Sequence, residues 1–119
     1  MANLLVSCSY GKEDPERAIL SFIFGNVAAA ADQKTAVLLT IEGVRLATTG
    51  YADNITKEGF QPLKDVMAAF LANGGEIWAC GTCAKPRGIS ETDLIEGAHI
   101  VTAAHVVQYI ASGATSIGF

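Results

Sequence analysis

Two cysteines separated by two residues are the clearest candidates for chemistry in this chain. Cys80 and Cys83 follow the short apolar run at residues 77–79, and a basic turn with Lys85 and Arg87 comes directly after them. A thiolate is the nucleophilic form of cysteine, and a helix N-terminus, nearby cations or a second cysteine at this spacing favours its formation. The pattern favours redox, sulfur or metal chemistry, and the alternative is a pair of small buried hydrophobic side chains.

The rest of the sequence alternates short apolar runs with amphipathic segments. Strands are expected over residues 3–8, 35–41, 77–79, 98–101 and 115–119, and helices over 15–31, from 62 to about 72 and from 102 to about 112. The β-branched run at 35–41 is typical of a strand covered on both faces, as in a parallel sheet. We therefore expect a single α/β domain over residues 1–119, with a five-stranded, mainly parallel sheet and helices on both faces.

Two shorter patterns refine this expectation. Ser90 and Asp93 have the spacing of a capping box, which predicts a short helix that ends near residue 97. In the last helix, Val106, Val107 and Ile110 are expected to face inward.

Composition limits the class of protein. Half of the 119 residues are hydrophobic and 17% are charged, against about 25% in a typical protein, which favours an oligomer that hides part of its surface. The net charge of −4 argues against nucleic acid as a partner.

No apolar run is long enough to span a membrane, and the N-terminus does not resemble a signal peptide. A cytoplasmic protein is expected, in which three cysteines stay reduced.

Several other residues are candidates for lining a site. Cys8 ends the first strand, where open α/β sheets bind ligands, although a core thiol is the alternative. Glu42, Arg45 and Tyr51 lie in the long connection at residues 42–61, and a connection of this length is usually functional or an interface. A solvated loop with one packed aromatic ring is the alternative there. The loop at residues 7–14 lacks the pattern of a phosphate-binding P-loop.

A metal site is not expected. The two histidines, His99 and His105, fall in different predicted elements, and together with Cys80 and Cys83 they match no compact zinc pattern. The sequence carries no signature that calls for a cofactor.

Taken together, several motifs resemble the DsrE/DsrF-like family across nearly the whole chain. The motifs are the polar loop after the first strand, the turn at residues 42–47, the helix between Gly59 and Gly74, and Cys80-Gly81-Thr82-Cys83 before Arg87-Gly88-Ile89. The cysteine stretch is the most specific of them.

This resemblance implies a flavodoxin-like fold, a homo- or hetero-oligomer such as a trimer or hexamer, and a cysteine at the end of the third main strand that carries sulfane sulfur as a persulfide. The position of the carrier in this family matches Cys80. Cys83 is not part of the carrier pattern, although other members of the family have a similar pair. This departure matters, because a neighbouring thiol can attack the persulfide, release sulfide and leave a disulfide.

The leading hypothesis is a sulfurtransferase-like carrier that takes sulfur from a donor protein or polysulfide onto Cys80 and passes it to an acceptor protein. Cys83 then acts as an auxiliary or resolving thiol. One alternative is a dithiol–disulfide redox protein that uses Cys80 and Cys83. Another is a non-catalytic oligomeric subunit that binds a small molecule or a partner.

Overall fold

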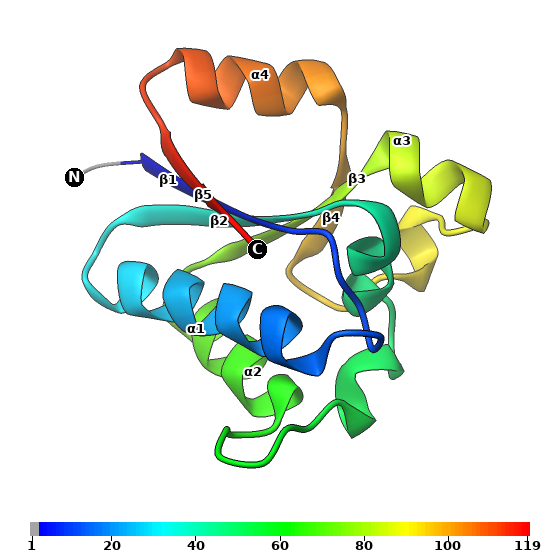
Figure 1. The fold of residues 1–119 in the computed structure, drawn as a ribbon. Coiled ribbons are helices and arrows are strands. Elements are labelled where there is room, and N and C mark those ends of the chain that lie inside the picture. The colour runs from blue at the N-terminus through cyan, green and yellow to red at the C-terminus, as the bar shows by residue number, and fades with distance from the viewer. Residues whose placement is uncertain (1–2) are drawn as a thin grey trace.

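The computed structural model describes residues 3–119 and shows a single parallel sheet (Figure 1). Within these residues the five strands run in the spatial order β4-β3-β2-β1-β5, and all neighbouring strands are parallel. The predicted α/β sheet is confirmed. The strands are β1 (Asn3–Cys8), β2 (Lys34–Leu39), β3 (Glu76–Cys80), β4 (Ala98–Val101) and β5 (Thr115–Gly118).

Helices cover the two faces of the sheet unequally. Helices α1 (Pro15–Ala30) and α2 (Leu63–Ala72) pack side by side on one face, and α4 (Ala103–Ala111) lies alone on the other (Figure 1). Asp14 begins α1 by accepting a hydrogen bond from the Arg17 amide. In the described part of the chain, no helix combines the length and the apolar character needed to cross a membrane.

Short helical turns connect the carboxyl ends of the strands to the next elements. They are the 3₁₀ segments η1 (Ile41–Ala47), η2 (Tyr51–Asn54), η3 (Lys85–Arg87) and η4 (Glu91–Asp93), and the one-turn helix α3 (Gly81–Ala84). The capping box predicted for Ser90 and Asp93 is present and begins η4, which is shorter than the predicted helix.

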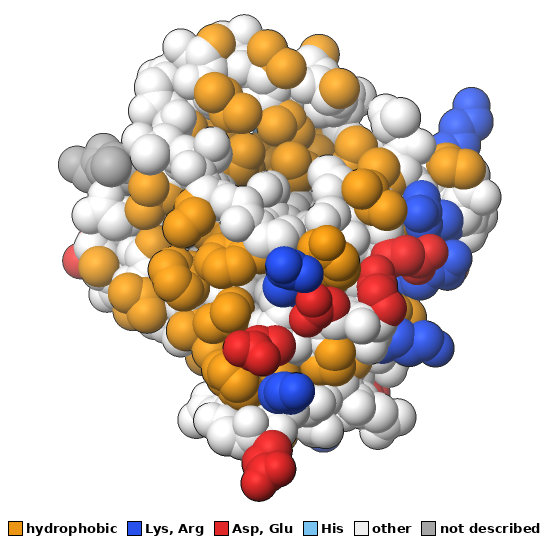
Figure 2. Space-filling view, in the orientation of Figure 1, with side chains coloured by type: hydrophobic (Ala, Val, Ile, Leu, Met, Phe, Trp, Pro, Cys, Tyr) orange, Lys and Arg blue, Asp and Glu red, His pale blue; other side chains and the backbone are white. Residues whose placement is uncertain are grey.

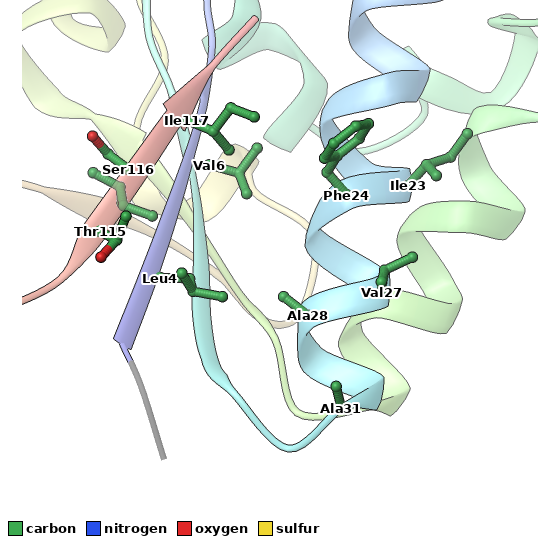
Figure 3. A pocket seen from close by; sticks show the side chains of 11 residues that line it. Leu4, Val6, Ile23, Phe24, Val27, Ala28, Ala31, Thr115, Ser116 and Ile117 are labelled. Carbon is green, nitrogen blue, oxygen red and sulfur yellow. The ribbon is translucent and has the colours of Figure 1, made fainter.

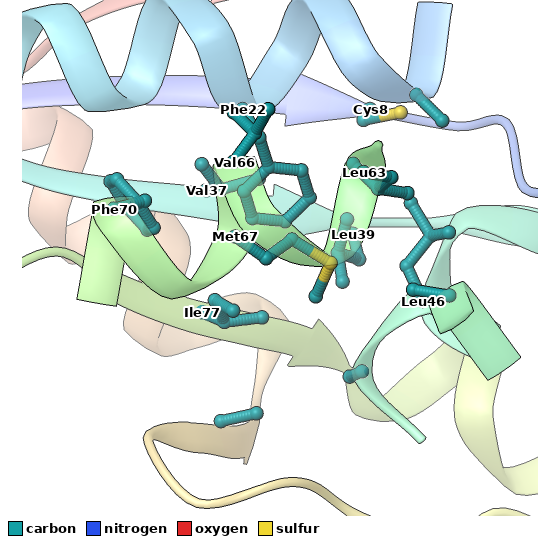
Figure 4. Packing of buried hydrophobic residues seen from close by; sticks show 14 of the residues in the cluster. Cys8, Phe22, Val37, Leu39, Leu46, Leu63, Val66, Met67, Phe70 and Ile77 are labelled. Carbon is teal, nitrogen blue, oxygen red and sulfur yellow. The ribbon is translucent and has the colours of Figure 1, made fainter. Parts of the chain in front are cut away.

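The main core lies between the sheet and the pair α1 and α2 (Figure 4). Phe22 of α1 and Phe70 of α2 are both fully buried, and their rings meet edge to face with centroids 5.8 Å apart. The opposite face has a much smaller buried cluster under α4, formed by Leu5, Ala36, Leu38 and Trp78. Most of the buried hydrophobic contacts of the sheet are therefore made on the face that α1 and α2 cover.

The predicted inward face of the last helix is wrong in two of three positions. Val107 and Ile110 are 64% and 43% exposed, whereas Val106 and Tyr109 pack on the small cluster. The Tyr109 ring meets Trp78 edge to face, and its hydroxyl donates to the Leu4 and Lys34 carbonyls. The bulky indole of β3 and these two acceptors determine which side of α4 faces the sheet.

The second strand also ends earlier than predicted. It stops at Leu39, and Ile41 begins η1 with a φ of 52°, a left-handed conformation that is rare for a β-branched residue. This turn brings Gly43 so close to the end of β1 that a side-chain carbon at Gly43 would collide with the Cys8 carbonyl oxygen. The left-handed residue Ile41 therefore turns the chain so that η1 packs against the end of β1 at Cys8.

Candidate functional site

Cys80 and Cys83 lie together at the carboxyl end of β3. Cys80 is the last residue of the strand and the N-cap of α3, and Cys83 follows one helical turn later. Both are free thiols with half-buried side chains. Gly81 lets α3 run close to β4, because a side-chain carbon there would lie 3.2 Å from the Val101 carbonyl oxygen. The predicted strand-to-helix placement of Cys80 is confirmed.

An arginine joins the cysteine turn to the long connection. Arg87 donates one hydrogen bond from Nη1 to the Cys83 carbonyl oxygen at 3.1 Å and one from Nε to Glu42 Oε1 at 3.4 Å. The other carboxylate oxygen of Glu42 accepts from Arg45 Nε at 2.6 Å. The hydrogen bond from Arg45, followed by the contribution of Arg87, lowers the pKa of Glu42. One carboxylate is therefore shared by two guanidinium groups, one of which holds the backbone beside Cys83.

A polar pocket of about 350 Å³ opens on the other side of Glu42. Its lining residues come from the loop after β1 and from the connection after β2, and they are Lys12, Glu13, Glu42, Arg45 and Tyr51. The Tyr51 hydroxyl accepts a hydrogen bond from the Lys12 amide at 3.0 Å and so ties the two segments together. Charged side chains gather on this side of the molecule, as Figure 2 shows to the right of the sheet.

Three residues of this pocket are candidates from the sequence. Glu42, Arg45 and Tyr51 of the long connection all line it. Glu13 was missed, because a single charge in a turn-rich loop carries no signal until the fold brings residues 42–51 against it. The backbone amide of Gly11 donates to Glu13 Oε1 and that of Lys12 donates to Tyr51, so these two amides are not available to a phosphate.

Cys8 is not part of either site. Its side chain is fully buried in the main core (Figure 4), and its thiol lies 3.3 Å from the Tyr10 carbonyl oxygen. Burial raises the pKa of the Cys8 thiol. Of the two interpretations that the sequence left open for Cys8, the structure therefore favours the core thiol.

The remaining candidates lie apart from one another. Lys85 is exposed on η3, His99 Nδ1 lies 3.0 Å from Glu91 Oε1, and the His105 ring packs edge to face on Trp78 under α4. Among residues 3–119, no group of three or more His, Cys, Asp or Glu side chains is arranged to hold a metal ion.

A larger, apolar groove of about 500 Å³ lies beside the edge strand β5 (Figure 3). In the strand order, β5 lies three strands from β3, which carries Cys80. Phe24, Val27 and Ile117 line it and are 45%, 66% and 47% exposed. Hydrophobic side chains also dominate this side of the surface in Figure 2. An uncovered apolar strip of this kind is a feature of interaction surfaces.

Comparison with known proteins gives a family match over almost the whole chain. The model of the DsrE/DsrF-like family matches residues 2–119. The uncharacterized protein MJ0760 of Methanocaldococcus jannaschii is 30% identical over 107 residues, which are 90% of this chain but only 39% of that protein. The uncharacterized protein MK0008 of Methanopyrus kandleri is 30% identical over 101 residues, 85% of this chain and 78% of that protein.

Solved structures show the same fold. The YchN protein of E. coli superposes over the full length of both chains with a TM-score of 0.82 and 20% sequence identity. MTH1491 of Methanobacterium thermoautotrophicum also covers both chains completely, with a TM-score of 0.75 and 18% identity. At these identities the likeness establishes the architecture of the chain.

Proposed function

This chain belongs to the DsrE/DsrF-like family, and from that premise we propose that it carries sulfane sulfur as a persulfide on Cys80. Membership in the family supports a role related to sulfur metabolism in general. The observation that carries the finer proposal is the contrast among the thiols: Cys80 and Cys83 are free and half-buried at the carboxyl end of β3, whereas Cys8 is sealed in the core.

Loading of Cys80 is a single exchange at sulfur. The Cys80 thiolate attacks the outer sulfur of a donor persulfide, R–S–SH, and the bond between the two donor sulfurs breaks. The products are Cys80–S–SH and the donor thiolate R–S⁻, which takes up a proton from water. An acceptor protein removes the sulfur in the same way, when its own thiolate attacks the outer sulfur of the Cys80 persulfide.

Cys83 gives the carrier a second outcome. Its thiolate can attack the inner sulfur of Cys80–S–SH, which forms a Cys80–Cys83 disulfide and releases HS⁻. A dithiol reductant must then restore both thiols. Arg87 bears on this step, because its hydrogen bond to the Cys83 carbonyl oxygen fixes the turn that carries the second thiol.

Polysulfide loading tests the proposal directly. The reduced protein is treated with inorganic polysulfide, and its intact mass is measured before and after a thiol reductant. We expect a gain of whole sulfur atoms that the reductant removes. The gain should disappear in Cys80→Ser and persist in Cys8→Ser, which serves as the control for a buried thiol. In Cys83→Ser the sulfur cannot be released through a Cys80–Cys83 disulfide, so failure of both this variant and the wild-type protein to gain sulfur would rule out the carrier role.

Dithiol redox chemistry is a second candidate, favoured by the placement of Cys80 and Cys83 one helical turn apart at a helix N-terminus. It predicts a reversible Cys80–Cys83 disulfide with a reduction potential in the range of the glutathione pool. A titration in glutathione buffers, followed by mass after alkylation, measures this potential. Polysulfide treatment of Cys83→Ser distinguishes the two functions, because the carrier still gains sulfur on Cys80 whereas a protein limited to dithiol chemistry does not.

Assembly is a separate part of the proposal. The apolar groove beside β5 and the charge-poor composition support a homo-oligomer such as a trimer or hexamer. In the proposed function, this oligomer works in the cytoplasm and contacts donor and acceptor proteins at the end of the sheet that carries Cys80. Light scattering at micromolar concentration measures the assembly, and a monomer would contradict this part.

A non-catalytic binding subunit would keep its cellular role in Cys80→Ser and in Cys83→Ser.

A further inference from the structure

The polar pocket beside Glu42 contains two charges of opposite sign that the protein leaves without an ionic partner. Among the described residues, the Lys12 ammonium makes no ion pair and lies 5.9 Å from the centre of the Tyr51 ring. The Glu13 carboxylate accepts one backbone hydrogen bond, from Gly11, through Oε1. By contrast, Glu42 in the same pocket forms ion pairs with Arg45 and Arg87.

The walls of the pocket are held in place by packing. Tyr51 closes against the loop so tightly that a side-chain carbon at Gly11 would approach the Tyr51 hydroxyl to 2.5 Å. The same hydroxyl accepts the Lys12 amide hydrogen. The backbone that carries Lys12 and Glu13 is therefore held in place before a ligand binds. This lowers the entropy cost of ordering the loop on binding.

The size and charge of the pocket restrict its occupant. A volume of about 350 Å³ lies at the small end of the range of ligand sites, roughly 300–1,000 Å³. That volume suits an amino acid or a short peptide. An anion such as phosphate would meet the Glu13 carboxylate and two amides that are already hydrogen bonded. A ligand with both an ammonium and a carboxylate matches Glu13 and Lys12 at once.

The pocket is connected to the cysteine turn through one side chain. The carboxylate of Glu42 lines the pocket, and the Arg87 guanidinium that binds it also binds the Cys83 carbonyl oxygen, at 3.4 and 3.1 Å. The loops that line the pocket follow β1 and β2, and Cys80 ends β3. Because these strands are parallel, the pocket and Cys80 lie at the same edge of the sheet.

We propose that this pocket selects the sulfur donor: a persulfide of a small amino-acid or peptide thiol that carries both a free ammonium and a free carboxylate. The inference rests on the carrier function of Cys80 and names the class of its donor. The pocket holds the charged ends, and the outer sulfur of the donor is transferred to Cys80 as described above, with the peptide thiolate as the leaving group.

A matched set of donors tests the proposal. The persulfide of the tripeptide Gly-Cys-Gly is prepared in four forms: with both ends free, with the amino end acetylated, with the carboxyl end amidated, and with both ends blocked. Initial rates of sulfur loading on Cys80 are measured by intact mass at low donor concentration. We expect the free peptide to load fastest, and the rate to fall about threefold to fivefold for each blocked end, the range of an ion pair worth up to about 1 kcal/mol.

Charge-removing variants locate the effect. In Lys12→Gln the advantage of the free carboxylate should disappear, and in Glu13→Gln the advantage of the free ammonium should disappear. The control is Lys57→Gln combined with Glu58→Gln. This double variant removes an adjacent lysine and glutamate from an exposed segment outside the pocket and should leave all four rates unchanged.

Two outcomes overturn the proposal. Equal rates for the four donors would show that the charged ends are not recognised, and an unchanged preference in both pocket variants would show that another surface recognises them. Inorganic polysulfide separates these results from failure of the carrier function. If polysulfide loads Cys80 while the four peptides do not differ, only the donor assignment is wrong.

Discussion

The carboxyl ends of β1 and β3 both carry a cysteine, yet the two thiols have opposite environments. Cys8 ends β1 and is fully buried, whereas Cys80 ends β3 and is half-buried. Both strands lie inside the sheet, each between two parallel neighbours. Position at the end of an inner parallel strand therefore does not by itself make a thiol available.

The difference comes from what covers each strand end. At β1, Thr40 donates to the Cys8 carbonyl oxygen, η1 presses Gly43 against the same carbonyl, and the backbone of Phe119 bonds to Ser7 and Ser9. At β3 the chain turns directly into the one-turn helix α3, which places Cys83 beside the strand end. Two distant parts of the chain, residues 40–43 and Phe119, therefore close over the end of β1, whereas the end of β3 leaves Cys80 half-buried.

Native-state alkylation is the strongest way to break this comparison. With iodoacetamide, Cys80 and Cys83 should react in the folded protein. Cys8 should react at about one thousandth of their rate or below, because its exposure requires opening of the core. Mass spectrometry of peptides after timed labelling gives the three rates, and labelling in denaturant gives the reference. Comparable native rates for Cys8 and Cys80 would show that the covering of β1 is absent.

Substitution of Gly43 should open the covered end. Gly43→Ala places a methyl group against the Cys8 carbonyl oxygen, which the backbone cannot relieve without moving, and we expect a loss of about 3 kcal/mol in the free energy of unfolding. Urea denaturation measures the loss, and faster alkylation of Cys8 should accompany it.

The matched control for that change lies at the other cysteine. Gly81→Ala makes contacts of 3.2 and 3.3 Å, and the higher helix propensity of alanine, about 1 kcal/mol, offsets them. We expect a change of at most about 1 kcal/mol. An equal loss in both variants would contradict the claim that only the β1 end is tightly covered.

Alkaline pH should sharpen the comparison. Because burial raises the pKa of Cys8 in the folded state, the thiol stays neutral there, while in the unfolded state it ionises above its ordinary pKa of about 8.5. The stabilising contribution is therefore complete below about pH 8.5 and is lost as the pH rises through the folded-state pKa, with a slope of up to about 1.4 kcal/mol per pH unit.

Urea unfolding of the wild type and Cys8→Ala between pH 7 and 10 measures this term. The free-energy difference between the two proteins should be constant near pH 7 and shrink at alkaline pH. Tyr109, whose pKa is also raised by burial, is present in both proteins and cancels. Parallel curves over the whole range would contradict a buried, neutral Cys8.

The smallest expected effect concerns the turn between the two strand ends. Ile41 has a left-handed φ of 52° and is 54% exposed, so Ile41→Asn should relieve strain with little loss of burial and raise the free energy of unfolding by about 1 kcal/mol. Ile110→Asn is the control, because Ile110 is 43% exposed in the regular helix α4 and its replacement should not stabilise. Thermal unfolding gives both values.

Local patterns in the sequence predict the order of the secondary-structure elements and the placement of Cys80 and Cys83 after a strand. Alternation of apolar runs with helical periodicity predicts a parallel α/β sheet, and the structure confirms it. The spacing of Cys80 and Cys83 after an apolar run predicts a strand that leads into a helical turn, which is also confirmed. These features depend on neighbouring residues, and local periodicity and capping record them.

Contacts between residues that are far apart in the sequence are visible only in the folded chain. Glu42 and Arg87 are separated by 45 residues and form an ion pair, and the loop with Glu13 forms a pocket with Tyr51. The burial of Cys8 and the inward turn of Tyr109, in place of Val107 and Ile110, were decided in the same way. Each depends on the shape of a distant partner, such as the Trp78 indole or the turn at Gly43, and single-residue patterns carry no information about that shape.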